Sequence, residues 1–220
     1  MIIPNNSKEL FEKQRYVVVK QFLPIEICNI AFRYGIMKAD IRHPDGRWDD
    51  IQTMGSYSAY ADTLMECLLE FSIPHMEKIT GLKLFPTYSY FRTYKNGDVL
   101  EKHTDRPSCE ISLTLNLGQE ETKSWPIYMN GVEVDLKPGD MVVYRGTELD
   151  HWRDRNLGGK HVQVFMHYVD KQGPFGAYAK FDNREMLGLP SSKRNPESMK
   201  KVWEIEEQIR QNAEHHNKKT

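Results

Sequence analysis

The spacing of hydrophobic and polar positions changes near residue 83. Before that point, in residues 24–40 and 60–81, apolar side chains recur three and four positions apart, which is typical of amphipathic helices. The second segment carries an apolar stripe of Leu64, Cys67, Leu68 and Phe71. We expect Pro74 to divide this helix, because proline cannot donate the backbone hydrogen bond of a helix interior.

After residue 83 the spacing becomes that of β-strands. Short segments rich in β-branched and aromatic residues follow one another, with turn residues between them. They cover residues 84–94, 110–118, 125–131, 132–136, 140–146 and 161–169, and a similar segment at residues 16–24 precedes the helices. This order favours a mainly β fold with supporting helices. In such a fold antiparallel sheets close as a sandwich or barrel, and the N-terminal helices pack on one sheet.

These elements predict one domain in three parts, which fits a chain of 220 residues. Residues 1–82 supply a strand and the supporting helices, and residues 83–172 form the β core. Residues 173–220 are an extension that ends in a helix over the charged stretch 195–220, whose last residues we expect to fray.

Composition narrows the possible partners and compartments. The net charge of -1 gives no electrostatic reason to expect nucleic acid or an anionic membrane. No apolar run approaches the ~20 residues that span a bilayer, and the first residues lack the pattern of a secretory signal. The three cysteines, Cys28, Cys67 and Cys109, are widely spaced, which argues against a disulfide framework and a structural zinc site. We therefore expect a soluble, cytoplasmic protein with reduced thiols.

Three polar residues form a candidate metal site. His103 and Asp105 alternate with Thr104, so both point to one face of an extended segment. His151 follows a later strand, which the same barrel can bring beside His103. Two histidines and one carboxylate are the facial triad of non-haem Fe(II) oxygenases, which leaves three coordination positions open. The alternative is a surface pair, His103 and Asp105, with His151 as a core residue.

Four segments resemble a known family. The sequences YFRTYKNGDVLEKHTD, CEISLTLNLG, LKPGDMVVYRG and HWRDRNLGGKHVQVFMHYV are similar, in the same order, to Fe(II)/2-oxoglutarate-dependent dioxygenases of the prolyl 4-hydroxylase-like branch. The resemblance covers about residues 88–169 and implies a double-stranded β-helix, or jelly-roll barrel. It also implies that His103, Asp105 and His151 are the iron ligands.

The resemblance further suggests how 2-oxoglutarate is bound. Lys160 stands at the spacing where the family places the base that pairs with the distal carboxylate. Alternation puts Lys160 on one face with Val162, Val164 and Met166, which we expect to be the barrel interior. If Lys160 is instead a solvated turn residue, Arg153 or His161 is the substitute anchor.

Hydroxyl groups of the family pattern also have counterparts. Thr114, with Ser112 on the same face, matches the hydroxyl that bonds the cosubstrate carboxylate. Tyr94 matches a tyrosine that faces the cosubstrate, and Tyr88 and Tyr90 share its alternating face.

The implied activity is hydroxylation of a C–H bond by O₂, with 2-oxoglutarate converted to succinate and CO₂ and ascorbate as accessory reductant. The resemblance favours a prolyl residue of a peptide or protein as substrate. The stretch GQEETKSWPIYMNG departs from the family's GGET segment and puts a strictly prolyl substrate in doubt. A different residue, a small molecule, or a non-catalytic barrel that binds a metal or ligand remain alternatives.

Substrate contacts are expected around the barrel mouth. Residues 42–60 are either a lid or an ordinary surface loop, and Arg106 either meets the substrate or forms a surface ion pair. Trp125 is expected near the rim, and Trp152 should face away from the metal.

Overall fold

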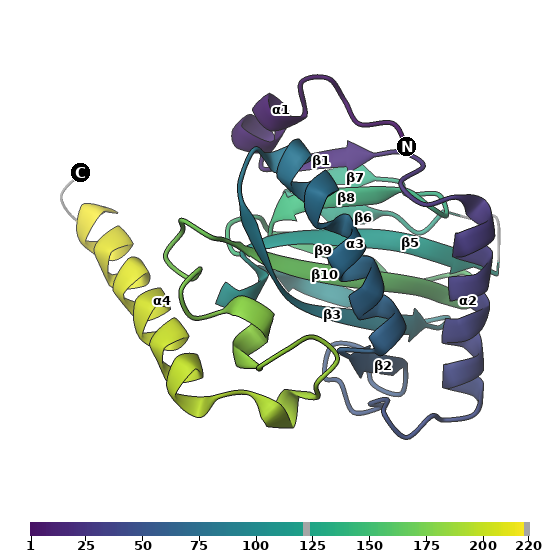
Figure 1. The fold of residues 1–220 in the computed structure, drawn as a ribbon. Coiled ribbons are helices and arrows are strands. Elements are labelled where there is room, and N and C mark those ends of the chain that lie inside the picture. The colour runs from purple at the N-terminus through teal and green to yellow at the C-terminus, as the bar shows by residue number, and fades with distance from the viewer. Residues whose placement is uncertain (121–123, 218–220) are drawn as a thin grey trace.

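Two antiparallel sheets form the centre of the molecule (Figure 1). The structure is a computed structural model that describes residues 1–120 and 124–217. The larger sheet has six strands in the order β1-β8-β5-β10-β3-β2: Tyr16–Val19, Met141–Arg145, Ile111–Gln119, His161–Asp170, Leu84–Tyr94 and Tyr57–Tyr60. The smaller sheet has four strands in the order β4-β9-β6-β7: Leu100–His103, His151–Arg153, Ile127–Met129 and Val132–Val134. The predicted mainly β jelly-roll class is confirmed.

The helices lie outside this pair of sheets (Figure 1). They are α1 (Ser7–Gln14), α2 (Ile25–Asp40), α3 (Thr63–Thr80) and α4 (Pro196–Asn217), with short 3₁₀ turns η1 (Pro107–Cys109), η2 (Lys180–Asn183) and η3 (Ser191–Lys193). Figure 1 shows α2 and α3 across one face of the larger sheet, as the sequence predicted. Among the described helices, none combines the length and hydrophobicity needed to cross a bilayer.

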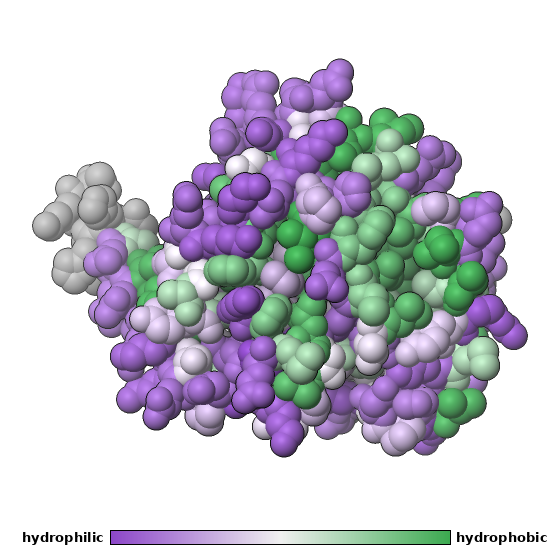
Figure 2. Space-filling view, in the orientation of Figure 1, coloured by the Kyte–Doolittle hydropathy of each residue, from purple (hydrophilic) through white to green (hydrophobic). Residues whose placement is uncertain are grey.

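Two predictions for α3 are wrong. The helix continues through Pro74 without a break. Pro74 is exposed, so the carbonyl group that loses its hydrogen bond there can be solvated by water. The apolar residues of the buried face are Met65, Leu69, Met76 and Ile79, and of the predicted apolar stripe only Leu68 packs, partly buried, against the core. Leu64 and Phe71 are exposed, and Figure 2 shows hydrophobic side chains over α2 and α3 on this face.

The main core lies between these helices and the larger sheet. Val162, Val164 and Met166 of β10 belong to it, together with the buried residues of α3. A Cβ atom on Gly35 of α2 would meet Val162 at 2.7 Å, so the helix backbone lies directly on this strand. The prediction of which side of β10 faces the barrel interior is therefore wrong: Val162 and Val164 face the helices. The alternate residues face the barrel interior and are His161, Gln163, Phe165 and His167.

Candidate active site

The metal-site candidates are brought together by one pair of strands. β4 and β9 are antiparallel, with His103 directly opposite His151. Asp105 follows the end of β4, where its backbone N–H donates to the carbonyl of Gly146 over 2.8 Å. Oδ1 of Asp105 then lies 3.7 Å from Nε2 of His103 and 3.6 Å from Nε2 of His151. This arrangement can hold one divalent metal ion.

Backbone carbonyls orient both imidazole rings. Nδ1 of His103 donates to the carbonyl of Glu101 over 2.7 Å, and Nδ1 of His151 donates to that of Leu149 over 2.9 Å. Each Nε2 therefore presents a lone pair toward Asp105. Burial lowers the pKa of His151, which keeps this ring neutral and able to bind a metal.

Ser112 holds the other oxygen of the Asp105 carboxylate. Its hydroxyl lies 3.1 Å from Oδ2 of Asp105, and Nδ1 of His167 lies 2.8 Å from the same hydroxyl. Burial lowers the pKa of His167 to about 4, so the ring is neutral. When the Ser112 hydroxyl donates its proton to Asp105, it accepts from Nδ1–H of His167. The sequence placed Ser112 beside Thr114 but gave no signal of this contact with Asp105.

A pocket of about 420 Å³ opens over the three candidate ligands. Its walls combine aromatic rings with arginine side chains, including Tyr60, Tyr88, Tyr90, Phe165, Arg92, Arg106 and Arg194. Of the predicted residues, Tyr88 and Tyr90 line this pocket, whereas Tyr94 is fully buried behind it.

Part of the proposed lid reaches this pocket. Arg47, Asp50 and Gln52 line it. Asp50 forms an ion pair of 2.5 Å with the buried Arg92, and Gln52 accepts a second hydrogen bond of 2.8 Å from the same guanidinium. The loop is therefore tied to the barrel interior rather than lying free on the surface.

Arg153 is a cation buried inside the barrel. Its side chain is 1% exposed, and it donates to the carbonyl of Trp125 and to Oε1 of Gln163. In residues 1–120 and 124–217, its partners are neutral oxygens and no carboxylate forms an ion pair with it, and its Nε has no hydrogen-bond partner. Burial lowers the pKa of Arg153 only to about 10, so it remains a cation at neutral pH. A buried cation of this kind fits a carboxylate ligand.

Gln163 connects this cation to the other predicted residues. It donates to the hydroxyl of Thr114 and accepts from Nε2 of His161 over 2.7 Å. The ring of Tyr94 packs edge-on against Trp125, with centroids 4.8 Å apart. Arg153, His161, Thr114 and Tyr94 thus belong to one buried cluster behind the metal site.

The structure does not bring Lys160 into this cluster. β10 begins at the next residue, and Nζ of Lys160 pairs with Asp40 of α2 over 2.6 Å. The expected position of Lys160 in the barrel interior is therefore wrong, since its side of the strand faces the helices. Of the three anchors that the sequence left open, the geometry favours Arg153.

Trp152 lies where its alternation suggested, whereas Trp125, which was expected near the rim, lies deeper. Trp125 is buried at the wall of the cluster, where its ring lies 4.8 Å below the guanidinium of Arg153. Trp152 stacks on Tyr128 on the opposite face of β9 from the two candidate ligands.

Comparisons with known proteins agree with the fold. No family model and no curated protein matches the sequence. Among solved structures, a prolyl-4-hydroxylase from Pseudomonas putida matches with a TM-score of 0.59 and 16% identity, over 74% of this chain and 97% of that one. The non-heme alpha ketoglutarate dependent epimerase SnoN from nogalamycin biosynthesis matches with a TM-score of 0.64 and 12% identity, over 75% and 82%.

A third structure holds a peptide. It is a prolyl hydroxylase from Trichoplax adhaerens in complex with a hypoxia inducible factor oxygen degradation domain peptide fragment. It matches with a TM-score of 0.58 and 10% identity, over 76% of this chain and 89% of that one. The chain therefore has the jelly-roll fold of the Fe(II)/2-oxoglutarate-dependent oxygenases.

Proposed function

We propose that this protein is an Fe(II)- and 2-oxoglutarate-dependent oxygenase that hydroxylates a C–H bond of a substrate in the 420 Å³ pocket. The observation that carries the proposal is the convergence of His103, Asp105 and His151, with each Nε2 directed at one carboxylate oxygen. When bound, iron and 2-oxoglutarate supply oxidation by O₂, with succinate and CO₂ as products.

The residues of the chain bind and orient these groups. His103, Asp105 and His151 would hold the metal ion, and a triad of this kind would leave positions open for the cosubstrate. Arg153 offers a buried positive charge for the distal carboxylate, and Gln163 and Thr114 supply polar contacts beside it. The rings of Tyr88, Tyr90 and Phe165 supply apolar surface to the pocket wall.

The substrate class has two candidates. Two of the similar structures are prolyl hydroxylases, one of them holding a peptide, which supports a prolyl residue of a peptide or protein. The similar epimerase comes from nogalamycin biosynthesis, which keeps a small molecule open. Mass spectrometry of proline-containing peptides after incubation with the enzyme separates the two, since hydroxylation adds one oxygen atom.

The activity itself is tested without knowing the substrate. With Fe(II), 2-oxoglutarate and ascorbate, the purified protein should release succinate slowly even when no other substrate is present. His103→Ala and Asp105→Ala should abolish this release. Lys102→Ala is the matched control, because Lys102 alternates outward and pairs with Asp150. Turnover at the wild-type rate in both ligand variants would refute the proposal, and metal binding without any succinate would favour a non-catalytic barrel.

A further inference from the structure

We propose that the substrate carries a carboxylate or a similar anionic group, and that Arg106 and Arg194 at the wall of the pocket bind it. This inference rests on the proposed function and narrows its substrate class. The observations that carry the inference lie in the C-terminal extension, residues 173–220, which supplies Ser191 and Arg194 to the pocket.

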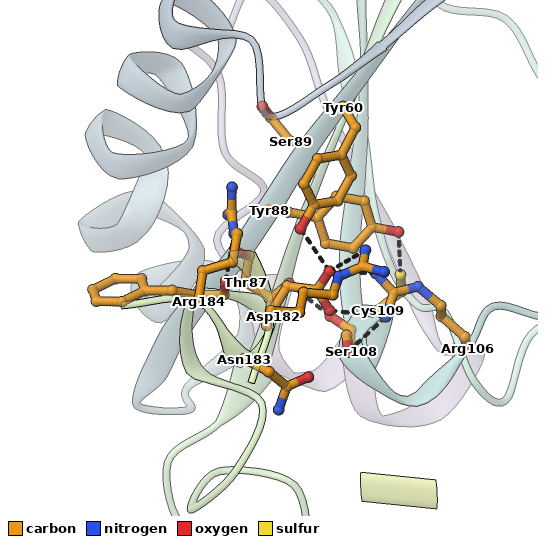
Figure 3. A network of polar contacts seen from close by, with 12 residues as sticks. Tyr60, Thr87, Tyr88, Ser89, Arg106, Ser108, Cys109, Asp182, Asn183 and Arg184 are labelled. Atoms are coloured by element: carbon orange, nitrogen blue, oxygen red, sulfur yellow. Dashed lines mark hydrogen bonds and ion pairs between the residues drawn. The ribbon is translucent and has the colours of Figure 1, made fainter. Parts of the chain in front are cut away.

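One buried carboxylate holds both arginines. Asp182 is 0% exposed and accepts two hydrogen bonds of 2.8 Å from the guanidinium of Arg106. Arg194 pairs with the same carboxylate over 2.5 Å, and the hydroxyl of Tyr60 donates to it over 2.6 Å. Figure 3 shows Tyr60 and Arg106 converging on Asp182. Two cations thus share one anion, which leaves a net positive charge at this wall.

The backbone that carries Asp182 is held in an uncommon conformation. Phe181, Asp182 and Asn183 have φ angles of 54°, 54° and 65°, in the left-handed region that non-glycine residues seldom adopt. Such residues persist only where surrounding contacts fix them, and they cluster at functional sites. Here the fixing contact is the buried ion pair between Arg184 and Glu66, at 3.0 Å. The segment is therefore positioned precisely against the barrel.

Arg106 joins this wall to the metal site. It directly follows Asp105 in the chain, and its guanidinium lies 4.5 Å from the ring centre of Tyr88. A third contact, a hydrogen bond of 2.8 Å from Arg106 to Ser108, fixes its orientation. A group bound to Arg106 would consequently lie close to the candidate metal ligands.

Both guanidinium groups keep donors for a ligand. Arg106 uses three N–H groups, in its bonds to Asp182 and Ser108, and the other two have no partner among the residues that the structure describes. Arg194 pairs with Asp182 through Nη2, and its Nη1 likewise has no hydrogen-bond partner within the described ranges. An anionic group in the pocket can satisfy these donors, and a neutral group satisfies them less well.

The charge of the whole pocket agrees with an anion. Four arginines and two aspartates line it, and one of the aspartates is the candidate ligand Asp105. Three of the four tyrosines that line the pocket already have a guanidinium over the ring: Arg92 lies over Tyr90, Arg106 over Tyr88 and Arg194 over Tyr60. A basic peptide or an ammonium compound is therefore disfavoured.

The test uses pairs of probes that differ in one charge. The full-length protein is loaded with Mn(II) and 2-oxoglutarate, and the paramagnetic broadening of each probe is measured by NMR. The first pair is 3-phenylpropionate and 3-phenylpropionamide. The second is acetyl-Pro-Asp-amide and acetyl-Pro-Asn-amide. The first pair reports a small acid and the second an acidic peptide, so the pair that responds identifies the source of the anion.

We expect the acid of at least one pair to bind about tenfold more tightly than its amide. Arg194→Gln should remove this preference and Arg194→Lys should restore part of it. Lys193→Gln is the matched control, because it removes one positive charge at the neighbouring exposed residue and should leave the preference intact.

Each contrary result has a separate meaning. Equal binding of acid and amide in both pairs, or no binding of either acid, overturns the anion site, and this comparison needs only wild-type protein. Retention of the preference in Arg194→Gln also overturns it. Binding of 2-oxoglutarate is followed in the same samples by the relaxation rate of water protons near Mn(II), which changes when the cosubstrate displaces water from the metal. Failure of that binding counts against the proposed function instead.

Discussion

Arg153 and Gln163 meet inside the barrel, where Nη2 of the arginine donates to Oε1 of the glutamine over 3.2 Å. The two residues come from β9 and β10, which belong to different sheets. A neutral amide satisfies one N–H group but does not offset the charge of a buried guanidinium. This pairing therefore leaves Arg153 as a fixed cation that an incoming carboxylate can neutralise.

The first prediction separates Arg153 from Lys160 as the cosubstrate anchor. Arg153→Gln should raise the 2-oxoglutarate concentration needed for half-maximal succinate release by about tenfold or more, because a charge-assisted pair is lost. Lys160→Gln removes the same charge from the surface pair with Asp40 and should change that concentration by less than about twofold. A larger effect of Lys160→Gln than of Arg153→Gln would return the anchor to the lysine.

The second prediction concerns the contact between Ser112 and Asp105. Ser112→Ala removes the hydroxyl that holds Oδ2, so the Asp105 carboxylate is free to rotate and to move Oδ1 away from the two histidines. Outer-shell contacts of this kind are typically worth about tenfold to a hundredfold in metal affinity. We expect a loss of this size in a Mn(II) titration followed by electron paramagnetic resonance. Ser191→Ala, at the exposed rim of the same pocket, should bind Mn(II) like the wild type.

Most strands of the larger sheet, and the convergence of the three candidate metal ligands, could be predicted from the sequence because their signals are local. Strand β2 was not predicted, because residues 57–60 fall within the stretch expected to be a lid or loop. Alternation over a few residues defines β3, β5 and β10. His103 and Asp105 lie two residues apart, and β4 needs only its neighbour β9 to bring His151 beside them.

The sequence could not predict which face of strand β10, or of helix α3, packs against the core between them. β10 is packed on both sides, so alternation alone does not say whether Val162 or His161 faces the barrel. Because of this ambiguity, Lys160 was predicted to lie in the barrel interior. In α3, Leu64 and Phe71 recur at a helical spacing, as the buried Met65 and Leu69 also do, and only the position of the sheet selects between the two stripes.

Long-range contacts of the C-terminal extension also had no local signal. Asp182 lies 76 residues after Arg106 and 122 after Tyr60. Its role in the pocket arises only when residues 173–194 are folded back against the barrel. A charged residue in a loop rich in Gly, Pro and Ser is ordinarily a surface residue, so the sequence favours the opposite expectation.

The third prediction is a pH dependence of stability caused by His161. Burial, with a further contribution from the charge of Arg153, lowers the pKa of His161 from 6.5 to about 3. Between these values the unfolded chain binds a proton at this site and the folded chain does not. The stability that His161 contributes is therefore complete above about pH 6.5 and falls as the pH decreases toward about 3, by up to about 1.4 kcal/mol per pH unit.

Urea unfolding of the metal-free protein tests this. His161→Gln removes the titrating group and retains a side-chain N–H group that can donate to Gln163. The difference in unfolding free energy between wild type and variant should change with pH between about pH 6.5 and about pH 5, in favour of the wild type at the higher pH. A difference that stays constant across this range would show that His161 is accessible to protons in the folded state.

The fourth prediction concerns the ion pair that fixes the C-terminal extension. Glu66 of α3 and Arg184 have side chains that are 3% and 0% exposed, and Glu66 also accepts from the backbone N–H groups of Ser89 and Gly188. Glu66→Gln leaves the buried guanidinium without a counter-ion. We expect a loss of about 3–5 kcal/mol in the free energy of unfolding.

The control for this loss is Glu9→Gln, which breaks the exposed pair with Lys13 and should cost less than about 1 kcal/mol. Because Arg184 follows Asp182 by two residues, Glu66→Gln should also weaken the preference for acidic over neutral probes at temperatures where the protein remains folded. Metal binding should persist there, since His103, Asp105 and His151 are held by β4 and β9. Equal stability of the two variants would mean that other contacts, such as the hydrogen bond of 2.9 Å from Arg184 to the carbonyl of Thr87, suffice to hold the extension in place.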